Sequence, residues 1–170
     1  MNTNRLIVLT VMISAAVFSR LIPHPPNFTP IAAIALFGGS YFSNRKLAFI
    51  VPFAAMFISD LIIGLHTLLP VIYACFAVIV FIGFQLSNNK STLRIGVAAL
   101  SSSIIFFIIS NFGVWLVGSF YPKTVEGLAA CYTAAIPFFQ NNLLGDLFYT
   151  SVLFGGFELV KRYTPTLREA

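Results

Sequence analysis

Long apolar runs alternate with short polar stretches along the whole chain, and none of the runs shows the residue-by-residue alternation of a strand with one wet face. Every backbone amide inside a bilayer needs an internal partner, so unbroken apolar runs predict helices. The pattern predicts six helices, over roughly residues 6–22, 30–43, 47–65, 67–86, 93–120 and 136–160. We therefore expect an all-α integral membrane protein, built as a bundle of six transmembrane helices.

Two segments depart from a simple series of spans. The second run has about 14 residues, fewer than the roughly 20 that cross a hydrocarbon core. We expect it to depend on the proline-rich stretch before it, on a thinner bilayer, or on close packing against its neighbours. Residues 121–135 read YPKTVEGLAACYTAA, in which Thr124, Glu126 and Gly127 suit a cap and a first turn. This stretch predicts a short, separate surface helix that serves as a connector or as a lid.

Composition supports one membrane domain over residues 1–170. The chain is 58% hydrophobic and 9% charged, with a mean hydropathy of +0.92, whereas soluble domains carry roughly a quarter charged residues. Its formal net charge of +5 needs no nucleic acid as a partner, because basic residues at helix ends set topology and contact anionic lipid.

The basic residues predict the orientation of the chain. Most of them fall in the segments that share a side with the N-terminus, and only Arg20 and Lys123 fall on the other side. By the positive-inside rule both termini are then cytoplasmic, in a multi-pass protein of the inner (plasma) membrane. The residues on the inner side are Arg5, Arg45, Lys46, Lys90, Arg94, Lys161, Arg162 and Arg168.

Polar side chains interrupt four of the apolar segments at similar depth. Counting 1.5 Å per residue from the predicted outer ends, they lie within about 15 Å of the outer surface. Two pairs have the i, i+4 spacing that places side chains on one helix face. Polar groups inside a bilayer are costly, which makes each one a functional candidate. The residues are Arg20, Asp60, Asn111, Trp115, Asn142 and Asp146.

Each of these residues also has a plainer interpretation. Arg20 could reach the headgroups, Trp115 could belong to an interfacial aromatic belt, and Asn111 could join two helices. Arg20 and Asp60 could form a structural ion pair, and His66 could be an exposed loop residue. No HxxxH or CxxC spacing supports a metal site.

The stretch between the first two segments, PHPPNFTP, is placed to cover this cluster of polar side chains. Four prolines in eight residues make a preorganised loop, since proline has little conformational freedom to lose. We interpret it as the rim of a cavity that opens outward, with Asn27 and His24 as further polar contacts, or as a bridge to the short second helix. The predicted substrate-binding residues are Arg20, Asn27, Asp60, Asn111, Trp115, Asn142 and Asp146.

The chain contains no GxxxxGK(S/T), HExxH or GxSxG motif. We therefore expect neither an enzyme nor a bound cofactor. A binding cavity without an energy source implies a coupled ion or a partner that supplies the work.

Six helices in about 170 residues, a short second helix after PHPPNFTPIAAIALFGG, Ser59-Asp60 and the Asn142 to Asp146 stretch resemble the substrate-binding S component of energy-coupling factor (ECF) transporters. The resemblance implies capture of a small, vitamin-like micronutrient, and association with a transmembrane T component and ABC ATPases. Two alternatives remain open, a structural assembly protein of the MreD type and an ion-coupled permease.

Overall fold

The computed structural model describes residues 2–167, so Arg168 of the predicted inner set lies outside the described part. All regular structure within this range is helical, as the sequence predicts. The elements are α1 (Thr3–Phe18), η1 (Ser19–Leu21), α2 (Ile31–Tyr41), α3 (Arg45–Ile63), α4 (Leu69–Leu86), α5 (Thr92–Val117), α6 (Val125–Thr150), the π-helical segment η2 (Ser151–Gly155), α7 (Gly156–Tyr163) and η3 (Pro165–Leu167).

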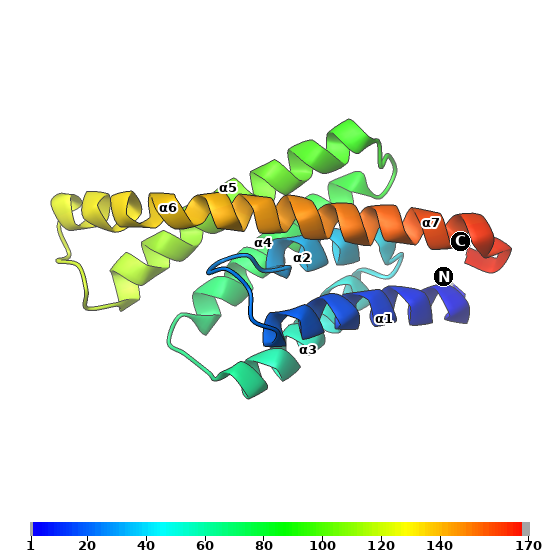
Figure 1. The fold of residues 1–170 in the computed structure, drawn as a ribbon, viewed down its shortest axis with the longest axis horizontal. Helices are drawn as coiled ribbons and strands as arrows, with labels where there is room; N and C mark the ends of the chain where they lie inside the picture. Colours follow the sequence, from blue (N-terminus) through cyan, green and yellow to red (C-terminus); the bar gives the residue numbers. More distant parts are fainter. Residues whose placement is uncertain (1, 168–170) are drawn as a thin grey trace.

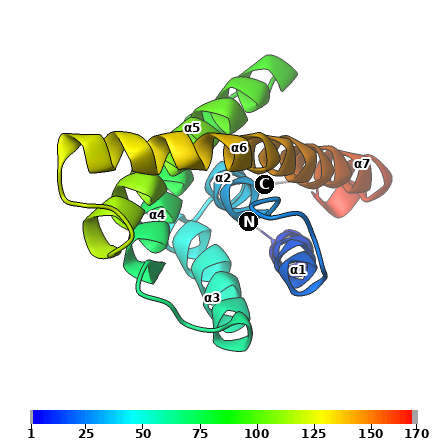
Figure 2. The ribbon, with the colours of Figure 1, turned by 60° about the vertical axis from the view of Figure 1, so that its left-hand side comes forward.

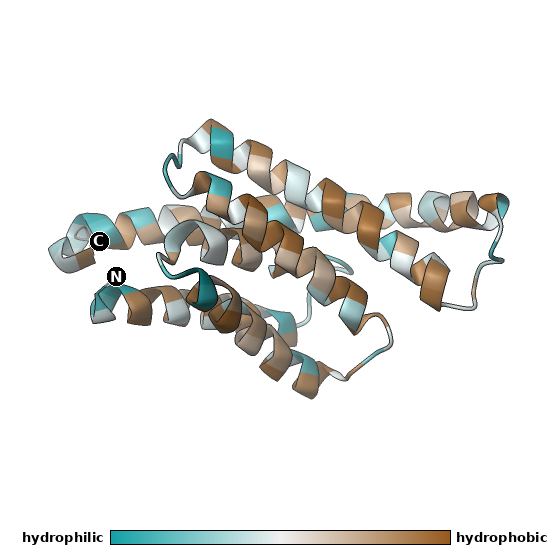
Figure 3. Cartoon of the chain, turned by 180° about the vertical axis from the view of Figure 1, so that it is seen from behind, coloured by the Kyte–Doolittle hydropathy of each residue, from teal (hydrophilic) through white to brown (hydrophobic). Residues whose placement is uncertain are grey.

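Five helices in the described range are long and apolar enough to cross a membrane, which makes the chain a multi-pass membrane protein. Apolar residues dominate the outer faces of these helices (Figure 3). Both termini and the connection at 87–91 lie at one end of the bundle, and the connections at 64–68 and 118–124 lie toward the other (Figure 1). The spans are Thr3–Leu21, Arg45–Ile63, Leu69–Leu86, Thr92–Val117 and Val125–Tyr163.

Helix α2 is the centre of the bundle. All 11 of its residues are buried, and it lies among α1, α3, α4 and α6 (Figure 2). Close packing is what allows this position, because a Cβ on Gly39 would lie 2.3 Å from the carbonyl oxygen of Val80 on α4. The short second segment is thus covered by protein, in agreement with the expectation that it depends on its neighbours.

The predicted separate surface helix at 121–135 is wrong. The Thr124 hydroxyl caps the amide of Gly127, 3.2 Å away, but the helix that starts there is α6 and continues past Pro137. Proline inside a helix costs a backbone hydrogen bond without necessarily ending the helix. Together α6, η2 and α7 form a continuous rod of 39 residues, roughly 58 Å long at 1.5 Å per residue. Its first turns extend beyond the other helices (Figure 1).

Candidate functional site

A cavity of about 280 Å³ lies between η1, the 22–30 loop, α3, the 64–68 connection, α4, α5 and α6. We call it the Arg20–Asp60 cavity, after the ion pair on its wall. Its polar residues are Arg20, Asn27, Thr29, Asp60, His66, Ser110, Asn111 and Asn142, and its phenylalanines are Phe106, Phe107, Phe138 and Phe139. The structure therefore brings five of the seven predicted site residues to one cavity, and His66 joins them.

The ion pair joins a buried carboxylate to a largely buried guanidinium, and both have further hydrogen-bond partners. Arg20 Nη2 lies 2.8 Å from Asp60 Oδ1, and the side chains are 11% and 4% exposed. The second Asp60 oxygen accepts a hydrogen bond of 2.8 Å from Tyr73, while Arg20 Nη1 donates to Ser59. The structural ion pair that the sequence left open is thus present. It gives the wall a guanidinium and a carboxylate whose charges balance each other.

The proline-rich loop is held firmly on α6. The Phe28 ring packs against Phe148 and Tyr149, with centroids 5.7 Å away from each. A Cβ on Gly145 would lie 3.0 Å from the backbone nitrogen of Thr29. Asn27 has a φ of 64°, a left-handed conformation that asparagine adopts more readily than most residues. This turn places Asn27 on the cavity wall, whereas His24 is exposed and contacts the carbonyl of Pro25.

Asn111 and Asn142 present amides from two different helices. Asn111 Nδ2 donates to the carbonyl of Phe107, 2.8 Å away. Asn142 Nδ2 donates to Asp146 Oδ2, 3.0 Å away. The side-chain oxygens of Asn111 and Asn142 can still accept hydrogen bonds. The two amides can therefore both donate to a solute and accept from it.

Asp146 lies one helical turn behind the wall and is not among the residues that line the cavity. It is 3% exposed and accepts a second hydrogen bond, of 2.6 Å, from Ser103 on α5. The structure thus connects Asp146 to the cavity through Asn142, whereas the sequence analysis placed it in direct contact with the solute.

Trp115 also lies outside the cavity wall. Its indole Nε1 donates to the carbonyl of Pro122, 2.9 Å away, and Lys123 Nζ lies 5.6 Å from the ring centroid. Lys123 also donates to the carbonyl of Trp115. These contacts fasten the 118–124 connection to the end of α5. The aromatic wall of the cavity comes instead from residues such as Phe107 and Phe139, whose ring centroids are 4.8 Å apart.

Sequence reasoning missed Ser103 and Phe107, although a signal for both was present. The positions Ser103, Phe107 and Asn111 follow one another at i, i+4 on α5, and the same spacing connects Asn142 with Asp146 and Thr150 on α6. The two faces meet in the structure through the bond between Ser103 and Asp146.

Comparison with known proteins yields one result. No curated protein and no solved structure matches the chain. Residues 1–167 match a family that is described as a family of unknown function, DUF6580. The chain therefore belongs to the DUF6580 family.

Proposed function

We propose that the chain is a membrane-embedded binding subunit that captures a small, water-soluble solute in the Arg20–Asp60 cavity. One observation carries this proposal: η1, two loops and the helices α3, α5 and α6 bring a guanidinium, a carboxylate, three amides and an imidazole to one aromatic-walled cavity. Binding sites for small molecules combine an apolar wall with a few convergent polar groups in this way.

The size and chemistry of the cavity limit the solute. A volume of about 280 Å³ lies just below the usual range for ligand sites, roughly 300–1,000 Å³, so the solute must be small. The amides and the ion pair favour a molecule with both hydrogen-bond donors and acceptors. The phenylalanines favour a flat ring, which is a property of a vitamin-like heteroaromatic micronutrient.

The proposal includes the topology and the partners that the ECF resemblance implies. Six helices would form the bundle of an S component, with α2 surrounded by the other five and both termini in the cytoplasm. The Arg20–Asp60 cavity would then face outward. A T component and ABC ATPases would supply the energy for transport, and lipid would cover the apolar outer faces.

Substitution of Asn111 tests the cavity directly. We expect wild-type protein, purified in mild detergent, to retain a small metabolite that native mass spectrometry detects. Asn111→Ala should lose most of it, because the substitution removes an amide from the wall and leaves the backbone unchanged. Asn141→Ala is the matched control, since Asn141 is outside the wall and adjacent to Asn142.

Equal retention by the two variants would contradict the proposal. A structural assembly protein of the MreD type would carry no metabolite in any of the three preparations. An ion-coupled permease would bind a solute and move it into vesicles that contain this chain alone. The carboxylate of Asp146 behind the wall is the observation that keeps this second candidate open.

A further inference from the structure

A second cavity, of about 410 Å³, lies at the end of the bundle that holds both termini. We call it the termini-side cavity. It separates the first turns of α5 from the rod formed by α6, η2 and α7. Gly96 on α5 and Gly155 on η2 both face open space, since a Cβ on either would meet no atom within 4 Å.

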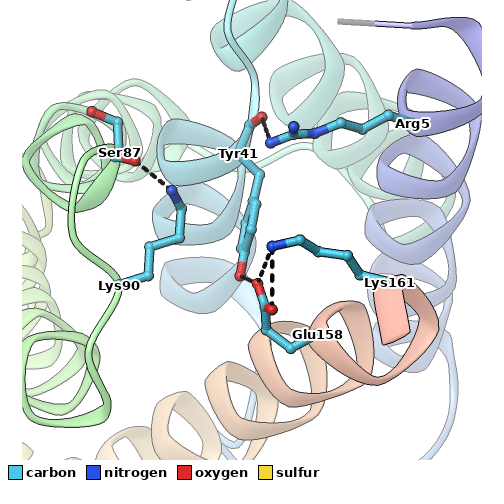
Figure 4. A network of polar contacts seen from close by, with 6 residues as sticks. All are labelled: Arg5, Tyr41, Ser87, Lys90, Glu158 and Lys161. Atoms are coloured by element: carbon cyan, nitrogen blue, oxygen red, sulfur yellow. Dashed lines mark hydrogen bonds and ion pairs between the residues drawn. The ribbon is translucent and has the colours of Figure 1, made fainter. Parts of the chain in front are cut away.

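The rim of the termini-side cavity is polar and charged (Figure 4). The Tyr41 hydroxyl donates to Glu158 Oε1, 3.0 Å away, and Lys90 Nζ donates to the carbonyl of Ser87, 2.5 Å away. Burial lowers the pKa of Lys90, and the Arg5 and Lys161 cations lower it further. Such a rim favours water at the mouth of the cavity.

The inner wall of this cavity also carries a hydroxyl. Thr150 lines the cavity and is 4% exposed, and its Oγ1 has no hydrogen-bond partner among the described residues. A buried hydroxyl is stable only if something satisfies it, and a cavity water is the usual partner. Thr150 therefore indicates that water reaches this depth.

A partition about 12 Å thick along the axis of α6 separates the two cavities. On α6, Asn142 lines the Arg20–Asp60 cavity and Thr150 lines the termini-side cavity. Asp146 lies midway, about 6 Å along the helix axis from each. On α5, Phe107 lines the first cavity, Ala99 lines the second, and Ser103 lies between them. The partition thus contains a carboxylate that is bonded to a hydroxyl.

Asp146 has no positive partner in the described part of the chain. The two ion pairs there join Arg20 with Asp60 and Lys161 with Glu158. Its contacts are the amide of Asn142 and the hydroxyl of Ser103. An ionised carboxylate in a bilayer interior needs a cation or a proton to neutralise it.

Six titratable groups lie on the walls of the two cavities. Arg20, Asp60 and His66 face the first cavity, and Tyr41, Lys90 and Glu158 face the second. From α2, which packs against α6, Tyr41 at the helix end is the titratable side chain. The 22–30 loop contributes Phe28 and Thr29 against Gly145, neither of which titrates.

We propose that Asp146 is a proton-binding site that exchanges protons with water in the termini-side cavity. A hydronium ion that enters past Thr150 gives one proton to the carboxylate, leaving water and a neutral carboxylic acid. The reverse transfer returns the proton to water. The only bonds that form or break in this exchange are the O–H bonds of the hydronium ion and of the carboxylic acid.

Protonation of Asp146 also changes the Arg20–Asp60 cavity, because Asn142 lines that cavity. This step rests on the proposed function. Ionised Asp146 holds the Asn142 amide through Oδ2. A neutral carboxylic acid is a weaker acceptor than a carboxylate, so protonation releases Asn142 to bind a solute. Solute binding and proton uptake are then linked, each favouring the other.

Infrared spectroscopy of the full chain in lipid bilayers tests the proton site without any solute. On acidification, the wild-type protein should gain a carboxylic acid C=O band. Exposed carboxyl groups such as Glu126 protonate as well and add their own bands. The band of Asp146 is the one that the Asp146→Asn variant should lose and the Glu126→Gln variant should keep. If Asp146→Asn fails to fold, Asp146→Glu serves instead, and its band should shift in frequency. Identical acidification spectra for the wild type and Asp146→Asn, or an unshifted Asp146 band in Asp146→Glu, would overturn the proposal.

The route through the termini-side cavity has its own measurement. Thr150→Val keeps the shape of the side chain and removes the hydroxyl, so hydrogen–deuterium exchange of the carboxylic acid should slow several-fold. Unchanged exchange would overturn this route. Solute retention is read separately by mass spectrometry. In the wild type, retained solute without an Asp146 band defeats the proton site alone, and an Asp146 band without retained solute defeats the proposed function alone.

Discussion

At the scale of single residues, the Arg20–Asp60 pair shows how a polar site is kept inside an apolar bundle. Arg20 Nη2 lies 2.8 Å from Asp60 Oδ1, and Ser59 and Tyr73 form hydrogen bonds with further polar atoms of the pair. A buried pair of this kind gives little net stability over an apolar core, yet removal of one member leaves an uncompensated charge. The pair therefore locks η1 to α3 beside the cavity.

Removal of one member of the pair should be strongly destabilising. For Asp60→Ala we expect a loss of about 3–5 kcal/mol in the free energy of unfolding, because Arg20 stays buried without its partner. The double variant Arg20→Met, Asp60→Leu should recover much of the loss. Urea unfolding in detergent, followed by circular dichroism, measures both.

A more exposed ion pair provides the control. Lys161 and Glu158 are 35% and 47% exposed, so Lys161→Ala should change the free energy of unfolding by less than about 1 kcal/mol. A similar loss for Lys161→Ala and Asp60→Ala would show that burial is not what makes the Arg20–Asp60 pair important.

At the scale of helices, contact between α2 and α4 depends on two glycines that face each other. A Cβ on Gly39 would lie 2.9 Å from the Cα of Gly83, besides its closer approach to the Val80 carbonyl. Both obstacles are backbone atoms, which cannot rotate away as the end of a side chain can. The distance between α2 and α4 is therefore set by the absence of these side chains.

A methyl group at this contact should separate the two helices. Gly39→Ala is expected to cost about 1–3 kcal/mol, the usual range for overpacking. Gly96→Ala is the matched control, since its new methyl meets no atom within 4 Å and alanine favours a helix by about 1 kcal/mol over glycine. Thermal unfolding in detergent should thus shift in opposite directions. A common direction would contradict the packing described for α2.

Helix positions were more predictable than helix continuity. The apolar runs located α1 to α5 within a few residues, because long apolar segments have few alternatives in a bilayer. Pro137 misled the prediction for α6, since proline marks helix starts and also occurs inside helices of membrane proteins. The sequence alone does not decide between the two, because neighbouring helices determine which one is stable.

The candidate site shows a similar division. Depth and spacing brought Asp60, Asn111 and Asn142 together correctly, because both follow from helix geometry. Trp115 and Asp146 were placed in the wall, and their actual partners, Pro122 and Ser103, lie on other segments. Such contacts depend on how each helix is rotated about its own axis. The sequence does not determine this rotation when apolar residues lie on all sides of the helix.

At the scale of the whole molecule, the positions of the connections decide which side of the membrane each cavity faces. The 87–91 connection lies with both termini, and the 118–124 connection lies toward the opposite end (Figure 1). The excess of basic residues at the termini predicts that this end is cytoplasmic. Under this prediction the Arg20–Asp60 cavity would open to the outside, as the proposed capture of an external solute requires.

Cysteine labelling tests this orientation. In a background in which Cys75 and Cys131 are replaced by alanine, we expect Lys123→Cys to react with a membrane-impermeant maleimide on intact cells. Asn88→Cys, in the 87–91 connection, should react only after the cells are permeabilised. The reverse pattern would place the Arg20–Asp60 cavity on the cytoplasmic side and exclude uptake from outside.

The complete burial of α2 also has a consequence for biogenesis. Its 11 residues are too few to span the hydrocarbon core as an independent segment, which takes roughly 20. The helices that cover it include α4 and α6, which the ribosome makes later. We expect the newly made α2 to stay at the translocon or the membrane surface until α4 and α6 are synthesised. We therefore expect the central helix to enter the bilayer only after the helices that cover it, rather than in the order of the sequence.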